Sequence, residues 1–244
     1  MKMTMTDLTE NEFNVMGEQL DEMAKKMGVT IEAVHDIGRI YSNEQTSTSE
    51  ILEKTKPTAE FSNISGMDAL TATKNMQDIT NQFKLLENEG AKASEVFSHV
   101  GDVMTAVSKN MVYDFSSGLQ QLSSAISTAG SVAQMSGVSM EKFTAEIGAL
   151  IEQTGMSGSE AATGYKMISA RVLQIKSVAE DLGVSEEDMS KAQKALDRLG
   201  ITIEDSTTGS LKPLDTILEE VGAKWNTLTD VEKQYTSEML AGEM

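Results

Sequence analysis

The side chains that could carry out chemistry are sparse in this sequence. Its two histidines, His35 and His99, stand 64 positions apart, and the chain contains no cysteine. These counts exclude disulfides, thiol catalysis, thiolate-held iron–sulfur clusters and zinc sites built from cysteine or several histidines. His35 precedes Asp36 and has the side-chain type of a general base, but the pattern favours a partly exposed surface histidine at both positions.

Carboxylates are abundant instead, with 38 Asp and Glu against 20 Lys and Arg. So many acidic residues create chance pairs at helical spacing, and no glycosidase acid/base pair can be selected from them. The sequence lacks the GxGxxG and GxxxxGK[ST] patterns that cradle phosphate, and no serine lies in a GxSxG motif or in an SxxK motif with supporting residues. We therefore predict that the chain is not an enzyme and has no catalytic, cofactor-binding or metal-binding residue.

The net charge of -18 argues against bulk attraction to DNA or to an anionic membrane. The polar N-terminus has no apolar segment typical of an export signal, and no run of 18 apolar residues occurs. We therefore expect no membrane-spanning helix and a soluble protein made in a cytoplasm.

Helices are the secondary-structure elements that we expect to position the side chains of this protein. Only 2 Pro and 11 aromatic residues occur among 244, whereas Met, Ala, Leu, Glu and Lys are common. Proline breaks helices, and β-proteins need more aromatic and β-branched residues, so the composition predicts an all-α fold.

A recurring joint punctuates the expected helices. In each joint a glycine ends one helix, an apolar residue follows, and a Ser or Thr caps the next helix. The four joints are Met27-Gly28-Val29-Thr30, Ser136-Gly137-Val138-Ser139, Thr154-Gly155-Met156-Ser157 and Leu182-Gly183-Val184-Ser185. Capping boxes are predicted at Thr9–Glu12, Ser157–Glu160 and Thr229–Glu232. Joints this short predict an array of short helical hairpins.

The periodicity of apolar residues gives the helix ranges. Helices are expected at 9–27, 31–41, 68–86, 92–109, 117–135, 140–153, 158–179, 186–199, 214–224 and 230–240.

Two segments depart from this pattern. Residues 42–66 are rich in Ser and Thr and contain Pro57, so we expect a connector with at most a short helix at 48–54. Residues 201–214 alternate apolar and polar residues around Thr207-Thr208-Gly209, which predicts one small β-hairpin near 201–214. Trp225, between the last two helices, is expected to plug the core, with a role as a partner anchor as the alternative.

The 17 methionines allow two interpretations. Methionine adapts to varied partners, and it also fills loose cores. Five of them fall on helical stripes, which favours the core: Met16, Met23, Met76, Met104 and Met167.

The stretch 118–244 resembles the core region of phage tail tape measure proteins of the type carried by phages and prophages of Gram-positive bacteria. One match is Val138 to Leu150 followed by Thr154 to Ala161, a second runs from Leu199 to Leu218, and a third begins at Trp225. The Gly164-Tyr165-Lys166 segment departs from the family pattern, and 176–199 looks like an added helical hairpin. The positions that carry the resemblance are Gly137, Val138, Ser139, Glu141, Gly155, Ser157, Gly158, Glu160, Ala161, Gly200, Asp205, Gly209, Leu211, Pro213, Trp225, Thr229 and Glu232.

The resemblance implies a structural virion protein that lies in the tail lumen, is made in the host bacterial cytoplasm, and takes part in tail assembly, length determination and genome ejection. Its implied partners are the tail tube protein, the tail assembly chaperones, the tail tip proteins and other copies of itself, without sequence-specific binding of nucleic acid and with membrane contact only at ejection. We expect N-terminal helices and a connector over 1–66 and a helical core region over 67–244, with one continuous domain as the alternative. A single helix of this length would span only about 370 Å, so we also expect the chain to be a fragment of a longer protein.

A second hypothesis remains open at this point. Residues 115–140 are uncharged and rich in small side chains, which suits a membrane-active helical module that forms pores or assists ejection. Leakage of liposomes would distinguish it from a purely structural role.

Overall fold

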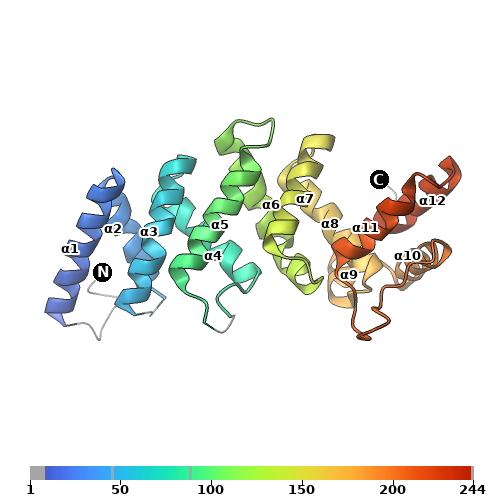
Figure 1. Ribbon diagram of the computed structural model, residues 1–244, viewed down its shortest axis with the longest axis horizontal. Coiled ribbons are helices and arrows are strands. Elements are labelled where there is room, and N and C mark those ends of the chain that lie inside the picture. The colour runs from blue at the N-terminus through green and yellow to red at the C-terminus, as the bar shows by residue number, and fades with distance from the viewer. Residues whose placement is uncertain (1–8, 45–46, 88–89, 243–244) are drawn as a thin grey trace. The chain divides into compact units, whose positions relative to one another are not determined.

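A computed structural model describes residues 9–44, 47–87 and 90–242, and it divides the chain into two compact units, 1–123 and 124–244. Twelve helices form the described part of the chain, so the prediction of an all-α fold is confirmed (Figure 1). The organisation into 1–66 and 67–244 stays a prediction.

The first unit is built from antiparallel helices that stand side by side (Figure 1). They are α1 (Glu10–Met27), α2 (Ile31–Ser42), α3 (Thr48–Ser65), α4 (Ala69–Gln82), α5 (Ala93–Ser108) and the first part of α6 (Phe115–Met135). Helix α3 packs against α1, α2, α4 and α5 and is therefore the centre of this unit.

The central position of α3 corrects the prediction of a connector over 42–66. The helix continues through Pro57, which is buried, and it also buries Ile51 and Phe61. Proline removes one backbone donor from the helix, but the hydroxyls of Thr55 and Thr58 bond the carbonyls of the preceding turn at 2.6 and 2.8 Å, so these polar residues fit inside the core. The polar composition of this segment therefore led to the prediction of a connector where the structure has a core helix.

A polar cluster lies inside the first unit, where α2 meets α3. The Lys54 ammonium is 6% exposed and lies 2.8 Å from carboxylate oxygens of both Glu44 and Glu50. Burial opposes its charge, but the hydrogen bonds to these two carboxylates raise the pKa of Lys54 above its ordinary value. Beside it, the Tyr41 hydroxyl lies 2.7 Å from Thr58 Oγ1.

The second unit contains the rest of α6 and six further helices. They are α7 (Met140–Thr154), α8 (Gly158–Val172), α9 (Lys176–Leu182), α10 (Glu186–Arg198), α11 (Leu214–Trp225) and α12 (Asp230–Ala241). One apolar cluster joins Val132 of α6 to Ala170 of α8 and to Val178, Val184 and Met189 in the α9–α10 hairpin. The expected helical hairpin over 176–199 is thus present.

Two predicted helices are shorter in the structure. The helix expected at 68–86 ends at Gln82, and the one expected at 158–179 divides into α8 and α9. Both breaks contain a residue in the left-handed conformation that is not glycine: Lys84 with φ 52° and Gln174 with φ 54°. Because neither Gly nor Pro marks these ends, the sequence carried no local stop signal.

The prediction of a small β-hairpin near 201–214 is wrong. Among the described residues this segment forms only an isolated antiparallel bridge between Glu204 and Leu211, with backbone bonds from Asp205 N to Ser210 O and from Lys212 N to Ile203 O. In this register Ile201 and Leu214 would form the next hydrogen-bonded pair, but their amides donate to the carbonyls of Leu196 and Ser136 instead, so the pairing does not extend into a ladder.

Candidate functional site

The glycine joints have the geometry that the sequence predicts. In all four joints the glycine has a left-handed backbone and the following Ser or Thr accepts a hydrogen bond from the third residue of the next helix. The three predicted capping boxes are confirmed, and Ser185 with Asp188 forms a fourth. At each of these joints, local chemistry thus fixes where one helix ends and the next begins.

The joint at 136–139 is also a contact point with a distant segment. Gly137 has φ +74°, and a Cβ built on it would lie 3.4 Å from Pro213. The Leu214 amide donates to the Ser136 carbonyl at 3.0 Å, and Val138 is buried beside the joint. Two resemblance positions far apart in sequence, Gly137 and Pro213, are therefore brought together. Ser139 caps α7, and Glu141 lies exposed in its first turn.

The joint at 154–161 is held by a capping box. Gly155 has φ +69°, and Ser157 caps α8 with Gly158 as its first residue and Ala161 buried one turn later. The backbone and side-chain hydrogen bonds from Ser157 lower the pKa of Glu160 below its ordinary value. The positive end of the helix dipole favours the same charge.

The remaining resemblance positions shape the C-terminal third. Gly200 follows α10, and the Asp205 carboxylate accepts hydrogen bonds from the Thr207 and Thr208 amides, so the turn is closed by a side chain. Those backbone hydrogen bonds lower the pKa of Asp205. Gly209 ends this turn with φ +69°, and Leu211 is 55% exposed.

Trp225 is the last residue of α11 and is only half-buried, so the expectation of a core plug is not met. Its carbonyl accepts from the Leu228 amide at 3.3 Å, which shapes the approach to α12. Thr229 and Glu232 then form the capping box that starts α12.

The histidines and methionines divide between surface and core. His35 is 37% exposed and lies 2.8 Å from Asp21, and His99 is exposed. Met16, Met76 and Met104 are fully buried, as predicted, whereas Met23 and Met167 are only half-buried.

A concave apolar groove of about 780 Å³ lies within the second unit, between α7, α8, α11 and the end of α12. Its apolar lining includes Ile147, Leu150, Met156, Met167, Ile168 and Leu218. The joint at 154–157 forms part of its wall, so the local joint positions α7 and α8 around this hollow.

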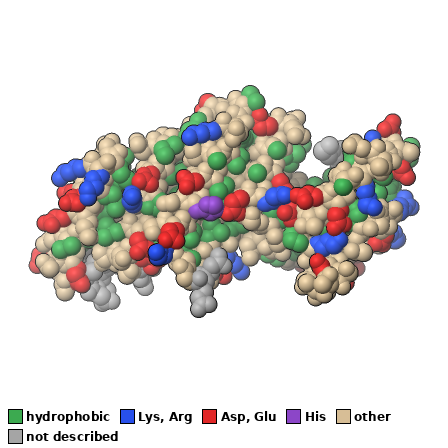
Figure 2. Space-filling model, in the orientation of Figure 1, with side chains coloured by type: hydrophobic (Ala, Val, Ile, Leu, Met, Phe, Trp, Pro, Cys, Tyr) green, Lys and Arg blue, Asp and Glu red, His purple; other side chains and the backbone are tan. Residues whose placement is uncertain are grey.

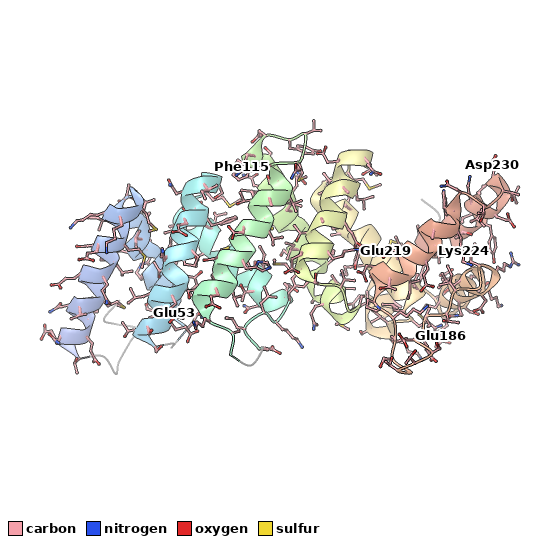
Figure 3. All side chains as sticks on the ribbon, in the orientation of Figure 1. Glu53, Phe115, Glu186, Glu219, Lys224 and Asp230 are labelled. Carbon is pink, nitrogen blue, oxygen red and sulfur yellow. The ribbon has the colours of Figure 1, made fainter. Side chains whose placement is uncertain are left out.

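The groove is acidic at one side. Lys142 of α7 forms ion pairs with Asp215 and Glu219 of α11; Glu219 is labelled in Figure 3. The ammonium of Lys142 is therefore engaged by these two carboxylates. Glu146, one turn further along α7, lines the groove and is half-buried. Burial raises the pKa of Glu146, the charges of Asp215 and Glu219 raise it further, and Lys142 acts in the opposite direction.

A tyrosine completes the polar part of the groove. Tyr165 is 6% exposed, packs edge-on against Phe143 with ring centroids 4.9 Å apart, and has a buried hydroxyl with no hydrogen-bond partner in the described residues. Burial raises the pKa of Tyr165, and the Glu146 charge adds to that effect. Sequence reasoning did not identify this groove; its one signal was that Gly164-Tyr165-Lys166 departs from the family pattern.

The described residues contain no group of three or more His, Cys, Asp or Glu side chains arranged to hold a metal ion. In that same part of the chain, no helix is long and apolar enough to cross a membrane. The groove therefore offers an apolar surface with carboxylates beside it, which is suited to binding a partner and not to holding a metal ion.

Comparison with known proteins identifies relatives of this chain. A family model described as phage-related minor tail protein matches residues 14–242, which extends well beyond the 118–244 stretch that carries the resemblance in the sequence. A probable tape measure protein of Escherichia phage P2 is 30% identical over 133 residues, which cover 54% of this chain and 14% of that protein. No solved structure matches the chain. Because the family model spans nearly all of the sequence, the chain belongs to the family of phage-related minor tail proteins.

Proposed function

We propose that this chain is the core region of a phage tail tape measure protein and takes part in tail assembly and in setting tail length. The observation that carries the proposal is the family match over residues 14–242, and the similarity to a probable tape measure protein supports it. Assistance in genome ejection and a Gram-positive phage or prophage as the source belong to the same proposal, on the resemblance of residues 118–244.

The fold supports a structural role within an assembly. Large apolar side chains stay exposed on several helices, among them Ile64 of α3, Leu70 of α4 and Val231 of α12, and are available for contacts. Figure 2 shows acidic side chains spread over the drawn face with apolar side chains between them. The net charge of -18 favours solubility and repulsion from DNA that shares the tail lumen.

The proposed partners are those of a protein enclosed by the tail: the tail tube protein, the tail assembly chaperones, the tail tip proteins and further copies of the chain. The proposed location is the lumen of the virion tail, after synthesis in the bacterial cytoplasm.

In-frame deletions in the phage protein that contains this chain test the length-setting role. Removal of helical segments outside residues 1–244 is expected to shorten tails by about 1.5 Å per residue, measured by electron microscopy of purified virions. Duplication of the same segments should lengthen tails equally. Unchanged tail length in viable deletions would contradict length determination while leaving membership of the tail family intact.

A membrane-active role is the second candidate, because α6 from Phe115 to Met135 is uncharged. Release of a fluorophore from liposomes at micromolar protein would favour it. Intact liposomes between pH 4 and pH 8 would remove it.

A further inference from the structure

Two polar groups of the groove, the Glu146 carboxylate and the Tyr165 hydroxyl, have no ion-pair or hydrogen-bond partner among the described residues. No nitrogen of a described Lys, Arg or His lies within 4.0 Å of the Glu146 carboxylate, since Lys142 is paired with Asp215 and Glu219 instead. The Tyr165 hydroxyl is buried and neither donates nor accepts a hydrogen bond among the described residues. Burying the Tyr165 hydroxyl without a partner disfavours folding. Because the half-buried carboxylate of Glu146 lines the same groove, a group from outside the unit that reaches both would be bound favourably.

The chemistry of the missing partner follows from these groups. A carboxylate selects a cation, and a phenol oxygen can accept a hydrogen bond from the same ammonium or guanidinium group. The acidic side chains of Glu160, Asp215 and Glu219 around the groove reinforce the preference for positive charge.

The shape of the groove selects an apolar helix to carry that cation. Its α8 wall runs from Ser159 to Ile168, which is about 14 Å or two to three helical turns. A volume of about 780 Å³ accommodates several large side chains from one face of a helix. Met156 and Met167 line the groove together with Tyr165, and their flexible side chains can adapt to an inserted helix.

We propose that the groove between α7, α8 and α11 binds an amphipathic helix of a different, basic protein, whose apolar face carries a lysine or arginine that pairs with Glu146 and Tyr165. A second copy of this chain fits poorly, because 38 acidic against 20 basic residues make two copies repel. The proposal does not depend on tail length, so the two can fail separately.

The first test titrates the full chain, labelled with ¹³C at its methionine methyl groups, with synthetic 18-residue helical peptides. The probe peptide has leucines along one face and a central lysine on that face; two matched peptides carry glutamate or norleucine in place of the lysine. The lysine peptide should shift the Met156 and Met167 signals and leave the buried Met76 and Met104 of the first unit unchanged. Binding should be at least tenfold weaker for both matched peptides.

Variants of the chain then link binding to the proposed groups. Glu146→Gln and Tyr165→Phe should each weaken binding of the lysine peptide about tenfold while raising or preserving the melting temperature. Glu180→Gln on α9 changes the net charge equally at an exposed position outside the groove and should bind normally. If Glu146→Gln failed to fold, Leu150→Gln at the 36% exposed wall of the groove should abolish the methionine shifts instead.

Several results would overturn the proposal. These are equal affinity for the three peptides, shifts confined to other methionines, or no shifts at millimolar peptide. Met156 signals that depend on protein concentration without peptide would identify a second copy as the occupant. The same shifts with phosphatidylcholine vesicles would identify lipid, and either result contradicts a basic helix.

Discussion

Gly137 and Pro213 lie against each other, so that the end of α6 and the start of α11 meet at a glycine with φ +74°. A Cβ at Gly137 would lie 3.4 Å from the Pro213 Cα, Cβ and Cγ atoms, and the Leu214 amide bonds Ser136 next to this contact. The joint therefore has a steric requirement in addition to its backbone conformation.

Leucine at Gly137 should be more destabilising than leucine at Gly155. Both positions have a left-handed backbone, which disfavours a side chain by about 1–2 kcal/mol, but a side chain at Gly155 meets open space. At Gly137 the Cβ alone would already contact Pro213, so the rest of the leucine side chain has to find room beside that residue. Urea denaturation of both variants measures the difference, and equal losses would contradict the importance of the contact.

Two buried tyrosines should respond oppositely to removal of the hydroxyl. Thr58 Oγ1 donates to the Lys54 carbonyl, so Tyr41 must donate to Thr58, and Tyr41→Phe should lower the free energy of unfolding by about 1 kcal/mol. Tyr165 has no such partner, and Tyr165→Phe should leave stability unchanged or raise it by up to about 1 kcal/mol.

Thr58→Val provides the control for this pair. It leaves the Tyr41 hydroxyl buried without an acceptor and should cost more than Tyr41→Phe, while the double variant should recover part of the loss. Additive losses in the double variant would show that the two hydroxyls do not interact.

Acid should destabilise the chain through the carboxylates that cap helices or close a turn. Hydrogen bonds to backbone amides and to Ser or Thr hydroxyls lower the pKa of these groups below the values of 3.8 for Asp and 4.5 for Glu: Glu12, Asp68, Asp114, Glu160, Asp188, Asp205 and Glu232. A carboxylate whose pKa is lower in the folded than in the unfolded chain stabilises the fold at pH values above its unfolded pKa. This stabilisation is lost as the pH falls through the folded-state pKa. The melting temperature should therefore fall from pH 5 downward, and Glu160→Gln should make that fall shallower.

Glu146 should behave in the opposite sense to Glu160. Its pKa is raised from 4.5, so its contribution is favourable below that pH and is lost as pH rises through the folded value. Glu146→Gln should therefore be more stable than the parent at pH 7 and indistinguishable from it at pH 4. Thermal melts at the two pH values check this, and a variant less stable at pH 7 would show that the carboxylate has a stabilising partner.

Glycine at the two unmarked helix ends should stabilise the protein. Lys84 and Gln174 adopt left-handed backbones that glycine adopts without the same steric penalty. Each of Lys84→Gly and Gln174→Gly should raise the free energy of unfolding by up to about 1 kcal/mol. Gln121→Gly, in the middle of α6, should lower it by a similar amount.

Features fixed by neighbours in sequence were the ones that could be predicted. A glycine followed by a capping Ser or Thr identifies a joint within four residues, so Gly155 and Ser157 were correctly placed. The helix ends at Gln82 and Val172 were missed because the left-handed residue after each is a Lys or Gln, and α3 was missed because Pro57 and several threonines resemble a connector.

The groove could not be predicted because its polar groups come from different helices. Glu146 and Tyr165 are 19 positions apart, and Leu218 lies 53 positions beyond Tyr165. Their proximity depends on how α7, α8 and α11 pack, which no local pattern encodes. A lone glutamate on an amphipathic helix reads as a solvated residue until the neighbouring helix is known.

The joints also mark where the chain would open under a pulling force. Helices α7 and α8 each contain 15 residues and are about 22 Å long. A pulling force that opened this hairpin at Gly155 would extend it to about 45 Å while every hydrogen bond within the two helices stayed intact. Opening would cost only the packing between the two helices and the geometry of the joint, so a series of such hairpins would lengthen under tension one hairpin at a time.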